Sequence, residues 1–366
     1  MKKIRDGQRS MDPRGRRLAN PDSPQSWRDH VYTKGVTVIM KKRLWLLSHL
    51  VAVILLTGCI SIMEGVTAEG SFDRTLEVSG PVNLDIRTGS GGIRVSHGDT
   101  SQVRIHGVIR VRRSSHSEAE DIVRELEQNP PVEQNGNEIR LGHQNRDDES
   151  RRNVSISYEV IVPAQTELRA RTGSGSVDVE GLAQPVEART GSGSVDVKDV
   201  SSRVEAHTGS GSITLTSIQG ETEAHTGSGR IRAEGLAGPF TGSTGSGSIS
   251  IEQTAAGGAD IQTGSGGIKA LGVEGPLKAR TGSGSIKAEG KPIADWDLHT
   301  GSGSISLRLP PDAAFNFEGR SSSGGISIDH PVTVQGKVER RRIQGPVRGG
   351  GPLVRVETGS GSVKVE

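Results

Sequence analysis

The sequence predicts an all-β protein: a parallel β-solenoid of about ten coils of roughly 18–19 residues each, preceded by a small N-terminal β region that carries one short helix. A phrase of the form Thr-Gly-Ser-Gly-Ser recurs at a nearly constant interval through the second half of the chain. Residues on either side of it alternate between apolar and polar, and only 2% of the 366 residues are aromatic. A short, fixed period of this kind is typical of solenoids. A core poor in large side chains suits two closely spaced sheets.

The front of the chain has the layout of an export signal. Residues 1–39 are polar and patternless, so we interpret them as a disordered extension or as the result of a start codon placed too early, with Met40 as the true start. Residues 40–58 hold a basic stretch and then a mostly apolar run from Leu44 to Leu56. This is the order of a signal peptide, and the run is short for a membrane-spanning helix.

The single cysteine of the chain closes this signal peptide. Leu56-Thr57-Gly58-Cys59 resembles the bacterial lipobox, whose cysteine is acylated and becomes the new N-terminus. The sequence therefore predicts lipidation of Cys59, although a free thiol or an ordinary signal peptide stays open as an alternative. Two or more acyl chains would hold the protein stably on a membrane. Because Ile60 rather than aspartate follows, the resemblance favours an outer-membrane lipoprotein of the cell envelope, facing either the periplasm or the surface.

Residues 59–71 read as a flexible tether, and residues 72–165 as the N-terminal β region. This region contains a first copy of the phrase at 88–93. Residues 117–128 form the expected helix, because Ser117 can cap its start and its apolar residues share one face. Alternating residues predict strands at 102–113, 137–141 and 153–163.

Residues 166–366 form the repeat. The threonine of the phrase recurs at nearly equal intervals, at Thr172, Thr190, Thr208, Thr226, Thr244, Thr263, Thr281 and Thr300. A variant without threonine stands at 321–326, and a last full copy begins at Thr358 after a longer gap, which predicts a loop or hairpin excursion. The chain then ends at Val363–Glu366 in a strand pattern with no capping segment. We therefore expect the last coil to lie at an open end of the stack and to allow end-to-end self-association.

Within one repeat, alternation sends Val186, Ala188 and Thr190 to one side of a strand and Glu187 and Arg189 to the other. The glycine-serine phrase then makes a corner, and a second short strand follows it. We attribute the glycines to the sharp turn of that corner. An inward Thr190 also argues against an exposed threonine face of the kind found on ice-binding solenoids.

Two sets of outward side chains are candidates for chemistry. His207 and His225 occur one coil apart and share a face with Glu205 and Glu223, so they are near enough to share a metal. Arginines in neighbouring coils would repel a cation, and we expect no metal and no other cofactor. We interpret the column as a solvated ladder.

Asp178 and Asp196 occupy neighbouring outward positions and could act as the paired carboxylates of a polysaccharide-cleaving enzyme. Their column continues with residues that are not acidic, Thr214, Arg232, Ser250 and Lys269. The serines of the phrase match no nucleophile motif. We therefore predict that the protein is not an enzyme and has no catalytic residues.

Charge argues against a nucleic-acid partner. The segment 1–59 holds twelve Lys and Arg against four Asp and Glu, so the rest of the chain holds 33 against 39 and is mildly acidic. The chain has only two tyrosines. Nucleic-acid binding normally needs basic patches and stacking aromatics.

The repeated phrase, the segment "RRNVSISYEVIVPAQTEL" and the final "VETGSGSVKVE" together resemble DUF4097, a bacterial β-strand-repeat family of unknown function labelled "putative adhesin". The resemblance covers residues 72–366. It implies a β-repeat envelope protein, in lipoprotein form, with no known catalytic residues. We expect a non-catalytic, lipid-anchored envelope protein that serves as an adhesin-like scaffold or as a binding surface for a glycan or protein. A carbohydrate-active β-helix enzyme and a self-assembling envelope element stay open as alternatives.

Overall fold

The computed structural model describes residues 66–98, 101–142, 153–333 and 339–366. The predicted signal peptide, Cys59 and the start of the tether lie outside the described residues. Within the described ranges, no helix is both long enough and apolar enough to cross a membrane.

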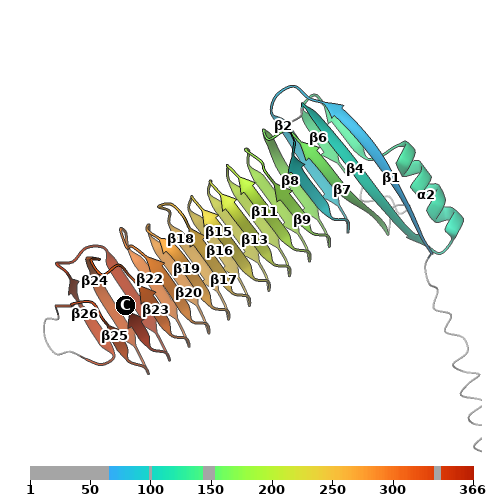
Figure 1. Cartoon of the computed structure of the whole chain (residues 1–366). Coiled ribbons are helices and arrows are strands. Elements are labelled where there is room, and N and C mark those ends of the chain that lie inside the picture. Colours follow the sequence, from blue (N-terminus) through green and yellow to red (C-terminus); the bar gives the residue numbers. More distant parts are fainter. Residues whose placement is uncertain (1–65, 99–100, 143–152, 334–338) are drawn as a thin grey trace, which may run out of the picture. The chain divides into compact units, whose positions relative to one another are not determined.

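Over these ranges the chain forms two sheets of 14 strands each, and most neighbouring strands in them run parallel. Each coil contributes one strand to each sheet (Figure 1). We call the sheet that holds the strands after each glycine-serine corner sheet A, and the other sheet B. The predicted all-β solenoid fold is confirmed.

Regular coils follow one another along both sheets. In sheet B their strands are β8 (Thr166–Thr172), β10 (Val186–Thr190), β12 (Val204–Thr208), β14 (Thr222–Thr226), β16 (Phe240–Thr244), β18 (Ala259–Thr263), β20 (Leu277–Thr281) and β22 (Trp296–Thr300). In sheet A they are β9 (Val177–Glu180), β11 (Val195–Val200), β13 (Ile213–Ile218), β15 (Ile231–Leu236), β17 (Ile249–Gln253), β19 (Ile268–Val273), β21 (Ile286–Gly290) and β23 (Ile305–Arg308). Inward side chains such as Ala188 and Val195 are fully buried, as their alternation predicts.

The N-terminal β region continues the same two sheets. Its strands β2 (Val82–Thr88) and β3 (Ile93–His97) pair in parallel with β8 and β9 and so form a further coil. Sheet A then extends through β7 (Val154–Val162), β4 (Gln102–Arg113) and β1 (Val66–Glu77), and sheet B through β6 (Glu138–Leu141) and β5 (Val132–Asn135).

The single helix of the described chain, α2 (His116–Gln128), confirms the helix expected in this region. It packs on β1 and β4 and buries Ala119, Val123 and Leu126. Residues 66–71, which the sequence assigns to the tether, instead form the first half of β1. Gly70 lies directly under the helix, where a Cβ atom would come within 2.4 Å of Val123 Cγ1. The small residues of this strand therefore serve helix packing rather than flexibility.

The C-terminal strands do not stack in chain order. They are β24 (Phe315–Ser321), β25 (Ile326–Ile328), β26 (Arg342–Val347), β27 (Leu353–Thr358) and β28 (Val363–Val365). The last coil, β27 and β28, lies between the β22/β23 coil and the β24/β25 coil. Figure 1 shows β24, β25 and β26 at the end of the stack.

The prediction that Val363–Glu366 forms an open end is therefore wrong, because β28 is paired on both edges. The regular phrase at Thr358 continues the hydrogen bonding of the corner before it. The coil at 315–328, which lacks the regular phrase, lies at the end of the stack instead. There Phe315 packs edge-on against Phe317 and His330, and β26 pairs with the outer edge of β24. The sequence-based reason for end-to-end self-association is thereby removed.

The glycines of each corner are required by close stacking. A Cβ atom on Gly191 would lie 2.3 Å from the carbonyl oxygen of Gly173, and one on Gly193 would lie 2.0 Å from that of Gly175. Neither Gly191 nor Gly193 has a positive φ. The turn itself therefore does not demand glycine, which corrects the reason given from the sequence. What demands it is the backbone of the preceding coil.

The threonine of each corner points inward and links two coils. Thr190 Oγ1 donates to the carbonyl oxygen of Gly175 at 2.7 Å and accepts from the amide of Gly193 at 3.2 Å. The same pair of bonds occurs at Thr172, Thr208, Thr226, Thr244, Thr263, Thr281, Thr300 and Thr358. The threonines are buried, so they do not form the exposed row that ice binding would need.

Replacing Gly193 with alanine should destabilise the protein by about 3 kcal/mol, because the new methyl group must displace the backbone of the neighbouring coil. Thermal unfolding followed by circular dichroism measures the effect. The exposed neighbour Ser192 provides the control, and Ser192→Ala should leave the melting temperature nearly unchanged. Equal melting temperatures for the two variants would contradict the close-stacking argument.

Thr190→Val keeps the shape of the side chain but leaves the Gly193 amide and the Gly175 carbonyl without their hydroxyl partner. We expect a loss of about 1–2 kcal/mol in the free energy of unfolding. Thr190→Ser retains the hydroxyl and should cost less, and hydrogen exchange at Gly193 should rise only in the valine variant. A serine variant as unstable as the valine variant would assign the effect to the methyl group instead.

Candidate functional site

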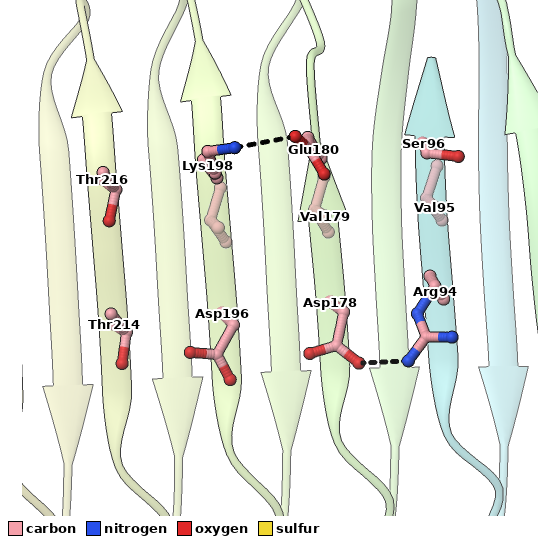
Figure 2. Close-up of a pocket in the computed structure, with 11 residues that line it drawn as sticks. Arg94, Val95, Ser96, Asp178, Val179, Glu180, Asp196, Lys198, Thr214 and Thr216 are labelled. Carbon is pink, nitrogen blue, oxygen red and sulfur yellow. Dashed lines mark hydrogen bonds and ion pairs between the residues drawn. The ribbon is translucent and has the colours of Figure 1, made fainter. Parts of the chain in front are cut away.

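The outer face of sheet A carries a groove, which we call the sheet A groove. Its first part has a volume of about 270 Å³ and crosses β3, β9, β11 and β13. Two columns of outward side chains form its walls (Figure 2). One wall holds Arg94, Asp178, Asp196 and Thr214, and the other holds Ser96, Glu180, Lys198 and Thr216. The floor between them is the strand backbone at residues whose side chains are buried in the core, Val95, Val179 and Val197.

The strand register builds these walls. Arg94 stands opposite Asp178, Asp178 opposite Asp196, and Asp196 opposite Thr214. Because residues i and i+2 of a strand point to the same face, each strand supplies one side chain to each wall. The structure thus brings together Asp178 and Asp196, which the sequence singled out.

A second hollow of about 280 Å³ continues the groove over β7, β4 and β1 and shares Arg94 and Ser96 with the first. Register extends the first wall from Arg94 through Glu159 and His106 to Asp73. It extends the second from Ser96 through Ile161 and Arg104 to Thr75. The sheet A groove therefore crosses seven neighbouring strands, from β1 to β13.

Ion pairs join the wall residues unevenly. Arg94 lies 3.1 Å from Glu159 and 3.8 Å from Asp178, and Lys198 lies 2.9 Å from Glu180. Asp196 has no hydrogen-bond or ion-pair partner among the described residues. Burial, and next the charge of Asp196, raise the pKa of Asp178 above its ordinary value, while Arg94 acts in the opposite direction. The stretch from Asp178 to Asp196 is thus an incompletely neutralised acidic part of the groove.

Glycosidases act through a pair of carboxylates. Such enzymes hold their carboxylates on the two sides of the bond that is cleaved. Asp178 and Asp196 are register neighbours in the same wall and lie on one side of any chain that follows the groove. In this geometry both carboxylates can accept hydrogen bonds from a ligand in the groove.

The histidine column lies on sheet B. The rings of His207 and His225 stack with their centroids 5.1 Å apart. Each Nε2 atom lies 2.8 Å from a carboxylate oxygen of its own strand, that of Glu205 or Glu223. The four residues are neighbours, as the sequence predicts. Within the described ranges, however, no group of three or more His, Cys, Asp and Glu residues is placed to hold a metal ion.

Sequence reasoning missed a contact at Ser243. Its Oγ lies 2.6 Å from His225 Nδ1, so Ser243, His225 and Glu223 form a hydrogen-bonded chain. Ser243 lies outside the repeated phrase, and only its place in the histidine column could have revealed it. Strand β16 is paired with β14 and β18 along both edges, so its ladder amides are not free to stabilise an oxyanion.

The sequence was compared with models of known protein families and with curated proteins. A family model described as Toastrack DUF4097 matches residues 82–366. No curated protein matches the chain.

Three solved structures are similar, and each covers 81% of this chain. One is a "putative cell adhesion protein" from Clostridium sporogenes, with 11% identity, 99% of that chain covered and a TM-score of 0.21. Another is a "putative adhesin" from Bacteroides fragilis, with 12% identity, 97% covered and a TM-score of 0.28. The third is a "putative lipid binding protein" from Parabacteroides distasonis, with 15% identity, 97% covered and a TM-score of 0.42.

Because the folded state raises the pKa of Asp178, its contribution to stability is fully present below the ordinary aspartate pKa and is lost as the pH rises through the raised value. The Asp178→Asn variant has no carboxylate to ionise at this position, so it does not lose this stability as the pH rises. The melting temperature of the variant relative to the wild type should therefore be higher at pH 7 than at pH 3.5. The effect should be small, because the side chain is 37% exposed.

Thermal melts across this pH range measure that difference. Asp312→Asn, which removes an exposed carboxylate between β23 and β24, is the control for the loss of one charge. A difference for Asp178→Asn that stays constant with pH would contradict the expected pKa direction.

Proposed function

The chain belongs to the Toastrack DUF4097 family, and from this premise we propose that it is a non-catalytic, lipid-anchored protein of the cell envelope with an adhesin-like binding surface. The observation that carries the proposal is the sheet A groove. It consists of two neighbouring hollows that share Arg94 and Ser96 and together cross seven strands, walled by side chains that donate and accept hydrogen bonds. Because its aspartates share one wall, the groove is suited to holding a ligand without cleaving it.

The anchor in this proposal is Cys59. The lipobox-like ending of the signal peptide supports acylation, and Val66 begins β1 a short distance later in the chain. A fully extended linker of that length spans at most about 25 Å. An acylated Cys59 would therefore hold the N-terminal end of the solenoid close to a membrane. The same features support export to the envelope, with the outer membrane as the proposed location.

One observation favours the alternative of a carbohydrate-active enzyme. A carboxylic acid with a raised pKa can act as a general acid, and the pKa of Asp178 is raised. An acid alone does not complete the pair that glycoside cleavage needs. This alternative predicts that the protein shortens an oligosaccharide during incubation and that Asp178→Asn abolishes the shortening.

Cys59→Ala should prevent acylation. Cells grown with a clickable palmitate analogue should label the wild-type protein and not the variant, and fractionation should move the variant from the membrane to the soluble fraction. Ser61→Ala, two positions further along, is a matched control that should keep both label and membrane attachment. Persistent labelling of Cys59→Ala would refute the anchor.

A further inference from the structure

We propose that the sheet A groove binds a neutral, extended polysaccharide that runs along the stacking direction, across the strands. This inference rests on the proposed binding function and names its ligand class.

The direction follows from the walls. Each wall is a register column, so the groove runs perpendicular to the strands from Asp73 to Thr214. The two walls stand about 7 Å apart, the spacing of residues i and i+2, and the strands follow each other at about 4.8 Å. One sugar unit of an extended glycan is about as long as this strand spacing. Successive sugars would therefore meet equivalent positions on successive strands.

The chemistry of the walls suits a chain of hydroxyl groups. Carboxylates such as Asp178 and Asp196 only accept hydrogen bonds, whereas Arg94 only donates them. Thr214 and Thr216 can do both. A sugar hydroxyl is likewise both donor and acceptor. Asp196, which has no partner in the described structure, is free to take a charge-assisted bond from such a hydroxyl.

The charge of the walls argues against an anionic ligand. Five carboxylates face the groove, those of Asp73, Glu159, Asp178, Glu180 and Asp196. Arg94, Arg104 and Lys198 oppose them with fixed positive charge. Arg74, whose guanidinium donates to the carbonyl of Gln128 in α2, adds a fourth positive charge at the border of the second hollow, so the lining keeps an excess of one carboxylate. A uronate, a sulfated glycan or a nucleic acid would be repelled by the acidic excess, and a neutral glycan avoids that cost.

The backbone argues against an extended peptide. Peptides that bind sheets usually add a strand to a free edge. Strands β4, β7, β3, β9, β11 and β13, which form most of the groove, are each paired on both sides. A peptide lying across them would find no backbone partners, whereas a glycan needs only the side chains.

The groove predicts a dependence on chain length. Among the described residues, no Phe, Tyr or Trp side chain lines it, so each sugar should add only modest affinity through hydrogen bonds. Because the groove spans seven strands, the gain should continue up to about six or seven sugar units and then level off. A fortuitous contact at one position would show no such series.

The test is titration calorimetry of the purified full chain with β-1,4-linked cello- and chito-oligosaccharides of two to eight units. We expect the dissociation constant to fall at least tenfold between two and six units and to level off beyond seven. The coiled maltose series and anionic oligogalacturonates should bind more weakly at every length. Equal affinity at all lengths, or tighter binding of the anionic series, would overturn the proposal.

Two matched variants test where on the protein the oligosaccharide binds. Ser96→Arg puts a long side chain in the middle of the groove, whereas Ser306→Arg makes the same change on the outer face of β23, outside it. We expect Ser96→Arg to weaken binding of the six-unit chain at least tenfold and Ser306→Arg to leave it unchanged. The double variant Asp178→Asn with Asp196→Asn keeps the shape of the groove and should weaken binding at least fivefold. It tests the same site if the Ser96→Arg variant fails to fold.

Binding that survives both groove changes would refute the groove as the glycan site. Binding only of a lysine-rich peptide would refute the ligand class, and shortening of the oligosaccharides would show that the groove is catalytic. None of these results bears on acylation of Cys59, so failure of the glycan proposal can be told apart from failure of the envelope anchor.

Discussion

The structure depends on how closely the corners of successive coils approach each other. Parallel pairing sets the distance between neighbouring strands, and at that distance the corner backbones are almost in contact. Gly193 can have no side chain because the carbonyl of Gly175 occupies that space. The Thr190 hydroxyl satisfies polar groups of both corners, one above the other. The phrase is repeated because each new coil must meet the same steric limit against the coil before it.

A fixed corner also fixes the register, and register creates the surface. Once Val177 lies beside Val195, the outward residues of each strand must form straight columns. Side chains far apart in sequence, such as Arg94 and Asp178, become neighbours in one wall. The inward positions are constrained by packing mostly to apolar residues, glycine and threonine, although their size ranges from Gly242 to Trp296. The outward positions can change freely, so binding specificity can be altered without disturbing the fold.

The period and the alternation were enough to predict the coils, the inward side of Thr190 and the pairing of Asp178 with Asp196. They were not enough to predict features that depend on contacts occurring only once in the structure. The order of the last coils could not be predicted, because the local sequence of residues 353–366 does not determine which strands they pair with. The far half of the groove was missed since Asp73, His106 and Glu159 come from strands without a period. Their positions follow only from antiparallel pairing around β4.

The placement of the last coil has a consequence for how the protein is made. A chain that is synthesised or exported from its N-terminus can add coils in order only as far as β22 and β23. Strands β24 and β25 then lack their neighbours until β27 and β28 have arrived and taken their places between. The stack can therefore be closed only after residues 353–365 have been made. A prematurely terminated product would expose the unpaired edges of β22 and β23, which quality-control proteases could recognise.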